Sequence, residues 1–397
     1  MTTKTLPLTS GQQSRFRTAD VLTIVSGHFT HDIYTAFVAP LLPMIIERLS
    51  LSLALAGGLT AIMRLPALLN PLIGYLGDRA GLRYFVILAP AATATLITLM
   101  GYAPGYSGLL VLFLVTGVSA AAFHALAPAM VAALSNHETG KGMSLFMAGG
   151  ELARTVGPLL AVWAVSTWGL GGLYRVVIIG WASSLVLFWR LRSIPTFKQA
   201  GRKSLRLALP TIRNLFLPLV GVLFFKTFLS VSLAVYLPTF MNREGANLWI
   251  SGGSLSVLEL AGVVGALVSG TISDRLGRKP VLLAAALASS GLLLLFLRVR
   301  GWALVPVLLA LGFSAMSTNP VLMATVQDHL PDNRGVGNGV YMTIDFLLQP
   351  LAMLLIGFFG DRIGLRATYA WIAWFSLLSV PAILTLPVTK KARLRAS

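Results

Sequence analysis

Twelve long apolar runs follow one another along this chain of 397 residues, and they constrain its fold more than any other feature. A helix needs about 20 apolar residues to cross the hydrocarbon core of a bilayer. Only 11% of the residues are charged, whereas soluble domains contain about 25%. With no cysteine present either, these properties exclude a soluble enzyme, a disordered chain and a disulfide scaffold. The runs lack the short alternating strands of a membrane barrel, so we predict an all-α polytopic membrane protein.

We predict six spans in each half of the chain. The first six are 20–46, 53–76, 84–103, 109–134, 143–168 and 173–191, and the last six are 214–241, 249–272, 280–297, 302–326, 337–359 and 368–386. Residues 1–191 and 214–397 are therefore expected to form two six-helix bundles, joined by a basic cytoplasmic linker at 192–213. The loops and tails leave no room for a separate soluble domain.

The distribution of positive charge predicts the orientation in the membrane. The formal net charge is +18, and 21 of the 31 Lys and Arg residues fall on the side of the two termini, against seven on the other side and three within spans. Cytoplasmic loops carry such an excess, so both termini are expected in the cytoplasm. Topology and contact with anionic lipid headgroups account for the charge. We therefore expect membrane lipids, and not nucleic acid, as partners, and no removable signal peptide.

The second half of the sequence repeats landmarks of the first half at a nearly constant offset of 192 to 196 residues. Such a repeat is typical of transporters built from two copies of one unit. The matched landmarks are Asp78 with Asp274, Pro43 with Pro238, and Gly157-Pro158 with Gln349-Pro350. They predict a duplicated six-span unit.

A Gly-x-x-x-Asp-Arg-x-Gly pattern follows both span 2 and span 8. Glycine allows close helix approach, and an aspartate can cap the N-terminus of a neighbouring helix. The cations can pair with acids or lipid phosphates, or they can serve only to set the topology. We predict a gate on the cytoplasmic side, formed by Gly74, Asp78, Arg79, Gly81, Arg83, Gly270, Asp274, Arg275, Gly277, Arg278 and Lys279.

Ten ionisable residues lie inside the predicted spans and away from their ends, where each costs at least about 2.5–3.5 kcal/mol at mid-depth and is expected to face the interior. The candidates for proton coupling are Asp32, Glu151, Glu259, Asp345, His28 and His31. The candidates for substrate binding are His31, Arg64, His124, Arg154 and Lys226, with Tyr34 and Tyr236. Asp32 ranks first for coupling because His28 and His31 flank it on one helical face, and Glu151 ranks second.

These residues also admit purely structural interpretations. Glu151 and Arg154 can neutralise one another, and Arg64 can pair with Glu259 between the two halves. His28 can be a helix-packing hydrogen-bond donor. The tyrosines, with Tyr341 among them, can be packing residues.

The duplicated loop pattern resembles the motif of the major facilitator superfamily. This resemblance implies two bundles related by a pseudo-two-fold axis, rocking around a central cavity lined by spans 1, 4, 7 and 10. His28-Phe29-Thr30-His31-Asp32 and the Phe123-His124 pair are similar to spans 1 and 4 of fosmidomycin-resistance-type efflux transporters. His31 stands where that family has Asn, and Ala125 where it has Pro.

Span 5 extends the resemblance to drug exporters. Gly150, Gly157 and Pro158 are similar to the antiporter motif of that class, in which a close helix contact prevents leak. The departures are Glu151 and Arg154, at positions that are small or polar in the family, and the missing arginine of span 4. The departures lie where the substrate would bind, so they bear on its identity.

Together these features predict a proton-driven exporter of a small anionic or amphipathic compound. The alternative on the same fold is proton-coupled uptake or exchange of an anionic metabolite. A receptor or a lipid-handling protein is a third possibility, disfavoured by the ten ionisable residues within spans. No Gly-x-x-x-x-Gly-Lys phosphate loop is present, so ATP is not expected to drive transport. We expect no enzyme activity, no cofactor, no metal, and a monomer in the bacterial inner membrane.

Overall fold

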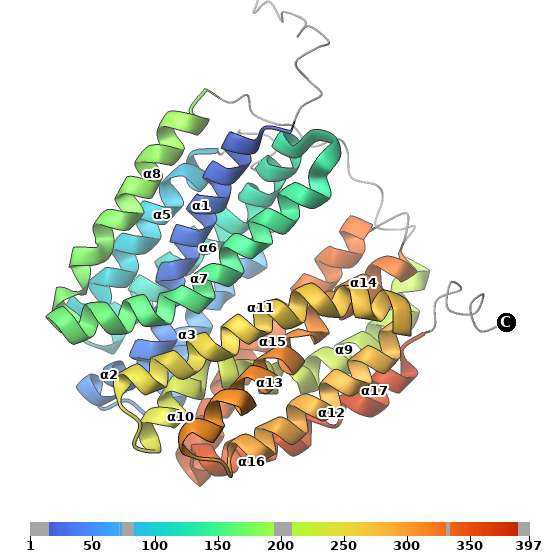
Figure 1. Ribbon diagram of the computed structural model, residues 1–397. Coiled ribbons are helices and arrows are strands. Elements are labelled where there is room, and N and C mark those ends of the chain that lie inside the picture. The colour runs from blue at the N-terminus through green and yellow to red at the C-terminus, as the bar shows by residue number, and fades with distance from the viewer. Residues whose placement is uncertain (1–15, 71, 74–82, 194–208, 331–333, 388–397) are drawn as a thin grey trace, which may run out of the picture.

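The structure is a computed structural model that describes residues 16–70, 72–73, 83–193, 209–330 and 334–387. Within these ranges every regular element is a helix. Figure 1 shows the helices in two groups, with α1 to α8 in blue to green and α9 to α17 in yellow to red. The two groups correspond to the two halves of the sequence.

The first half contains α1 Thr18–Thr35, α2 Val38–Leu49, α3 Leu53–Arg64 with the 3-10 turn η1 Leu65–Leu69, α5 Arg83–Thr98 with η2 Leu99–Tyr102, α6 Tyr106–Ser135, η3 Asn136–Glu138, α7 Thr139–Trp168, η4 Leu170–Val176 and α8 Val177–Leu191. The second half contains α9 Leu209–Val231, the π-helical turn η6 Ser232–Tyr236, α10 Leu237–Arg243, α11 Leu248–Leu276, α12 Arg278–Phe296, η7 Gly301–Ala303, α13 Leu304–Met316, α14 Thr318–His329, α15 Arg334–Ile363, α16 Leu365–Ser376 and α17 Ser379–Thr385.

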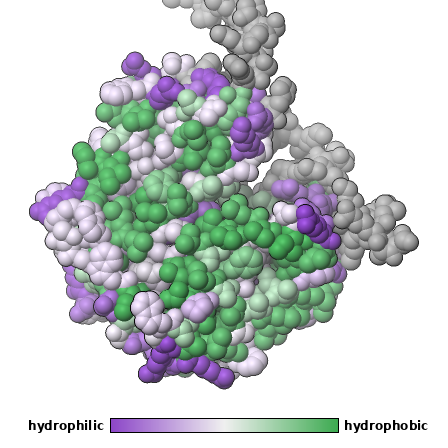
Figure 2. Space-filling view, viewed as in Figure 1, coloured by the Kyte–Doolittle hydropathy of each residue, from purple (hydrophilic) through white to green (hydrophobic). Residues whose placement is uncertain are grey.

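The predicted all-α membrane fold is confirmed. Eleven described stretches are long and apolar enough to cross a bilayer, and the shorter apolar helix Leu53–Leu69 occupies the position of the predicted second span. Figure 2 shows hydrophobic side chains across helices of both bundles, with hydrophilic ones gathered toward the rim of that face. Helix α9 begins at Leu209, earlier than the predicted 214, and most of the predicted linker lies outside the described residues.

Proline explains why three predicted spans are interrupted. Span 1 breaks between α1 and α2 at Ala36, span 7 passes through the π-turn η6, and span 10 breaks at Ser317. Ala36 and Ser317 lie four and three residues before Pro40 and Pro320, and the turn η6 ends two residues before Pro238. Proline has no N–H for the carbonyl four residues earlier and its ring collides with that carbonyl. Spans 1, 7 and 10 are thus composed of shorter helical pieces.

Equivalent helix contacts recur in the two bundles at the offset of 195 residues. In the first bundle, Gly117 of α6 packs on α3, where an added Cβ would lie 3.0 Å from the carbonyl carbon of Met63. In the second, Gly312 of α13 packs on α11, where a Cβ would lie 2.9 Å from the carbonyl carbon of Leu258. Both members of the pair are shifted by 195 residues, so the repeat extends to tertiary packing.

Among the described residues, the clusters that combine large buried side chains of both bundles lie toward one side of the molecule. We name the side with Phe16, Leu191 and Leu209 the terminal face, and the side with the Ser50–Ser52 turn the distal face. Toward the distal face, Leu53 belongs to the same buried cluster as residues of α10, α13 and α15. Toward the terminal face, the clusters around Phe123 and around Leu219 each contain residues of one bundle. The distal half therefore joins the bundles.

The glycine contacts give a stability prediction. We expect Gly312→Ala to lower the thermal unfolding midpoint of the purified protein, with an overpacking cost of about 1–3 kcal/mol, because its Cβ would lie 3.1 Å from the Cα of Leu258. Gly291→Ala in α12 is the matched control, since a Cβ there meets nothing within 4 Å. Equal midpoints for the two variants would contradict this account of the packing.

Candidate functional site

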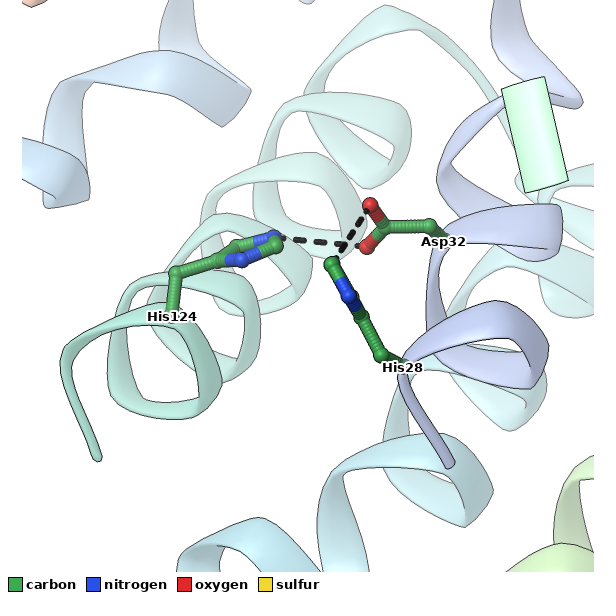
Figure 3. Close-up of side chains that lie close together, drawn as sticks. All are labelled: His28, Asp32 and His124. Carbon is green, nitrogen blue, oxygen red and sulfur yellow. Dashed lines mark ion pairs between the residues drawn. The ribbon is translucent and has the colours of Figure 1, made fainter. Parts of the chain in front are cut away.

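Asp32 in α1 stands at the centre of three imidazoles. Its Oδ2 lies 3.2 Å from Nε2 of His28, and its Oδ1 lies 2.8 Å from Nδ1 of His31 and 3.3 Å from Nε2 of His124. Figure 3 shows His28 and Asp32 side by side on one helix, with His124 reaching them from another. The His124 side chain is 37% exposed and that of Asp32 10%. His124 therefore connects this cluster, the Asp32 cluster, with its surroundings.

Local sequence builds the Asp32 cluster. His28 and Asp32 are four residues apart, so they share one helical face. The His28 ring stacks on Phe146 of α7 with centroids 3.9 Å apart, and the His31 ring stacks on Phe123 of α6 at 4.6 Å. Gly150 of α7 leaves the room that this requires, because a Cβ there would lie 2.6 Å from Cε1 of His28.

The hydrogen-bond partners of His28 constrain where its ring carries hydrogen. The Phe146 carbonyl oxygen, 2.8 Å from Nδ1 of His28, can only accept, so Nδ1 carries a hydrogen. A neutral imidazole has a single N–H, so Nε2 of a neutral His28 would then face an ionised Asp32 with no hydrogen between them. Their 3.2 Å contact therefore requires one further proton, on the imidazole or on the carboxyl group.

The same atoms are close enough to hold a metal ion. Donor atoms of His28, Asp32 and His124 all lie within 4.8 Å of one another. We expected no metal because only His28 and His31 are close together in the sequence and no thiolate is present, but folding also brings His124 to Asp32. In the structure both carboxylate oxygens of Asp32 have imidazole nitrogens as partners.

The second bundle carries a different polar pair at the equivalent place. Lys226 of α9 donates to Oδ1 of Asn319 in α14 at 2.5 Å. These residues follow His31 and His124 by 195 positions each. The repeat thus places a histidine pair in one bundle and a lysine–asparagine pair in the other, on spans 1 and 4 and on spans 7 and 10.

An ion-pair network crosses between the bundles through Arg154 of α7. Arg154 donates to Glu151 on its own helix, and its Nε lies 3.4 Å from Oε2 of Glu259 on α11. Glu259 is only 3% exposed. The predicted structural pair of Glu151 with Arg154 is therefore present. The predicted pair across the bundles also involves Glu259, but its partner is Arg154 and not Arg64. Arg64 lies at the end of α3.

The other predicted polar residues have local partners. Asp345 accepts from Nε2 of Gln349 on the same helix at 2.6 Å. Tyr34 donates to the carbonyl of Val176 at 2.6 Å, and Tyr236 and Tyr341 are also buried, with Tyr236 completely inaccessible. The structure thus places these three tyrosines in helix packing, where the sequence had offered Tyr34 and Tyr236 for substrate binding.

The predicted gate is described only in part. Gly74, Asp78, Arg79 and Gly81 lie outside the described residues, and Arg83 begins α5. The described residues of the second copy are Gly270, Asp274, Arg275, Gly277, Arg278 and Lys279. Arg278 pairs with Asp274 at 2.7 Å and with Asp328 at 3.0 Å, and Lys279 donates to the carbonyl of Leu384 at 2.8 Å. These three contacts join residues of the second bundle to one another.

The antiporter-like motif packs α7 closely on α1. A Cβ on Gly157 would lie 2.7 Å from Cβ of Ala36 and 2.9 Å from the carbonyl oxygen of Ile33. Pro158 follows inside the same helix. This contact fixes the distance between the helix that carries Asp32 and the helix that carries Gly150, so the motif positions the Asp32 cluster.

Sequence reasoning missed Phe123, Phe146 and Asn319 as partners of the site. Phe146 acts through its ring and its carbonyl, and neither can be distinguished in an apolar run. Asn319 had a detectable signal, because it is a polar residue in an apolar run at the repeat offset from His124.

Known proteins share both sequence and fold with this chain. The family model described as Major Facilitator Superfamily matches residues 24–353. The fosmidomycin resistance protein of Escherichia coli (strain K12) is 23% identical over 367 residues, which cover 90% of each chain. A solved variant of the nucleoside transporter NupG superimposes with a TM-score of 0.75 at 15% identity, over 92% of this chain and 99% of that one. The D-xylose-proton symporter gives 0.70 at 16%, over 95% and 99%.

The close contact at Gly150 gives a prediction for the Asp32 cluster. We expect Gly150→Ala to displace the His28 ring and change its side-chain ¹⁵N resonances, because the added Cβ would lie 2.8 Å from Nε2 and 3.2 Å from Oδ2 of Asp32. Nuclear magnetic resonance on ¹⁵N-histidine-labelled protein is practicable since the chain has five histidines. Gly140→Ala, on the same helix with nothing within 4 Å, should leave the resonances unchanged. An unchanged His28 signal in Gly150→Ala would refute the geometry.

The network around Arg154 gives an order of stabilities. Removing one partner of a buried ion pair costs about 3–5 kcal/mol, and because the Arg154 side chain is 43% exposed we expect Arg154→Gln to cost about 2 kcal/mol. Glu259→Gln should cost less, because Arg154 keeps Glu151. Thermal unfolding in detergent at neutral pH measures both variants. A larger loss for Glu259→Gln would show that Arg154 is not the centre of the network.

Proposed function

This chain belongs to the Major Facilitator Superfamily, and we propose that it is a secondary active transporter that exports a small anionic or amphipathic compound in exchange for protons. The observation that carries the proposal is the Asp32 cluster, in which Nε2 of His28 lies 3.2 Å from Oδ2 of Asp32, so that the two groups can share a proton. Ionisable residues inside membrane spans mark ion and substrate pathways. The relative named a fosmidomycin resistance protein supports export.

Proton coupling requires that the shared proton can leave when the site changes its surroundings. His124 is the partially exposed member of the cluster, and its Nε2 touches Asp32. His124 therefore offers a path for the proton between the surroundings of the cluster and the Asp32 carboxyl group. A carboxylate moved between a dry site and a site facing cations changes its proton affinity, so rocking of the bundles can load the proton on one side and release it on the other.

The proposed substrate site uses three cations that lie within membrane spans. Arg64, Arg154 and Lys226 come from both halves of the chain, and Arg binds phosphonate or carboxylate with two parallel hydrogen bonds. Arg154 already holds Glu151 and lies 3.4 Å from Glu259. An anion that binds it must compete with those two acids, or bind after one of them is protonated. Such competition links substrate binding to protonation.

Uptake or exchange of an anionic metabolite is the second candidate. It is favoured by the shared fold with a protein named as a D-xylose-proton symporter, since the same architecture there couples sugar and proton movement in one direction. The direction of transport decides between the two. In either case we propose that the protein is a monomer in the bacterial inner membrane, with both termini cytoplasmic, and that it needs no cofactor.

Transport in liposomes tests the proposal. We expect purified protein in proteoliposomes to move radiolabelled fosmidomycin opposite to an imposed proton gradient. Asp32→Asn should reduce gradient-driven movement to the level of protein-free liposomes, because the amide cannot carry the proton, while substrate exchange at equal pH continues. Asp20→Asn is the matched control, since Asp20 is also on α1 but pairs with Arg17 at 2.7 Å outside the cluster.

Two outcomes would overturn parts of this proposal. Movement of the compound along with the proton gradient would establish uptake in place of export. Intact coupling in Asp32→Asn, with coupling lost in Glu151→Gln, would transfer the proton site to the network around Arg154. A panel of small organic anions, run beside fosmidomycin, tests the substrate class.

A further inference from the structure

The loop motif that follows spans 2 and 8 has a third occurrence, at the end of α15. Residues Gly360-Asp361-Arg362-Ile363-Gly364-Leu365-Arg366 match Gly77-Asp78-Arg79-Ala80-Gly81-Leu82-Arg83 at six of seven positions. Gly357 also supplies the earlier glycine of the pattern. Spans 2 and 8 run toward the terminal face, whereas α15 ends at the distal face. The third copy therefore lies on the opposite side of the membrane.

The backbone of the third copy repeats that of the second. In the second copy α11 ends at Leu276, α12 begins at Arg278, and Gly277 between them has φ 93° and ψ 155°. In the third copy α15 ends at Ile363, α16 begins at Leu365, and Gly364 has φ 80° and ψ 153°. Positive φ of this kind favours glycine. The sequence likeness thus corresponds to one structural motif.

The aspartate of the third copy caps a helix of the other bundle. Asp361 accepts hydrogen bonds from the backbone N–H groups of Leu53 at 2.7 Å and Ala54 at 2.8 Å, at the start of α3. The Oγ of Ser52 accepts from Leu55 at 3.1 Å. Three N–H groups that a helix N-terminus leaves unpaired are satisfied, two of them across the bundle interface. The negative charge also meets the positive end of the helix dipole.

Glycines bring the two helices into backbone contact around this cap. A Cβ on Gly357 would lie 2.7 Å from the carbonyl carbon of Leu53, and one on Gly360 would lie 2.7 Å from Cδ1 of Leu53. The hydroxyl of Tyr236, a residue of the second bundle, donates to the carbonyl of Met353 at 2.6 Å and lies 3.4 Å from that of Leu53. Asp361 is therefore part of a closely fitted joint.

The pseudo-symmetric joint on the other side of the interface lacks the motif. Helix α11 has the same local cap as α3, since Asn247 accepts from Ile250 just as Ser52 accepts from Leu55. At the offset of 195, however, Asp361 corresponds to Ser166 and Gly357 to Val162. Of the two joints, α3–α15 and α11–α7, the α3–α15 joint therefore has a carboxylate from the opposite bundle at its helix N-terminus, and the α11–α7 joint does not.

We propose that the contact of Asp361 with the N-terminus of α3 is the latch that holds the distal face closed. Opening that face must pull α15 away from α3, which leaves a carboxylate and two N–H groups without their partners. The latch therefore sets how often the distal face opens. This inference rests on the proposed alternating-access transport, and it is independent of proton coupling, substrate and direction.

Double electron–electron resonance between spin labels measures the opening. The chain has no cysteine, so pairs of cysteines can be introduced without background. Labels at Glu47 and Arg300 report on the distal face, and labels at Lys141 and Leu276 report on the terminal face; all four are exposed. For Asp361→Ala we expect about a tenfold rise in the population open at the distal face, with the terminal-face distance shortening in step.

Two further variants keep the test decisive. Asp361→Asn, which retains one acceptor oxygen but no charge, should give a smaller rise and serves if the alanine variant fails to fold. Glu244→Gln is the matched control, because Glu244 pairs with Arg366 at 2.6 Å on the distal face but within one bundle. Its distances should equal those of the unmodified protein.

The outcomes separate this proposal from the transport mechanism. Distances in Asp361→Ala and Asp361→Asn that equal those of Glu244→Gln would overturn the latch, whatever the liposome experiment shows. A distal face that opens in the Asp361 variants supports the latch, even if fosmidomycin is not moved or Asp32→Asn remains coupled. Distances that never vary with any variant or added anion would contradict alternating access itself.

Discussion

A carboxylate inside a membrane span must be compensated, and the structure of the first bundle depends on how Asp32 meets that requirement. Two nitrogens reach it from its own helix and one from α6. The stacking of His28 on Phe146 and the missing side chain at Gly150 hold α7 against them. Charge in a low-dielectric region is unstable without such partners. The packing of three helices and the compensation of one buried carboxylate are therefore one arrangement.

The contacts between the bundles follow a related principle. Arg154 and Glu259 connect α7 to α11, and Asp361 connects α15 to α3. Both are polar contacts at helix pairs related by the internal repeat, yet one uses two side chains and the other a side chain and a helix end. Polar contacts of this kind are directional, so they exist in one relative position of the bundles and are lost in another. Apolar packing alone would discriminate less between such positions.

Sequence reasoning was most successful where a single physical requirement dominates. Span length predicted the number and the approximate bounds of the membrane spans. The breaks at Ala36 and Ser317 were not predicted, although a proline follows each of them. The helical spacing of His28 and Asp32 predicted their shared face. It could not identify the Phe146 carbonyl as a partner, because a backbone oxygen has no sequence signature. For a similar reason the sequence could not show that Tyr34 and Tyr236 donate to backbone carbonyls, since a tyrosine hydroxyl can find such a partner in any packed helix pair.

The sequence by itself determined that this chain is a helical membrane protein of two repeated halves with ionisable residues inside its spans, because apolar run length and a constant repeat offset are properties of the linear chain. Only the tertiary structure decided which of those residues meet. His124 joins Asp32, Arg154 rather than Arg64 joins Glu259, and Asp361 reaches α3. Such pairings depend on how helices far apart in the sequence are rotated and spaced. Close glycine contacts and interhelical packing set that rotation and spacing, and no local sequence pattern records them.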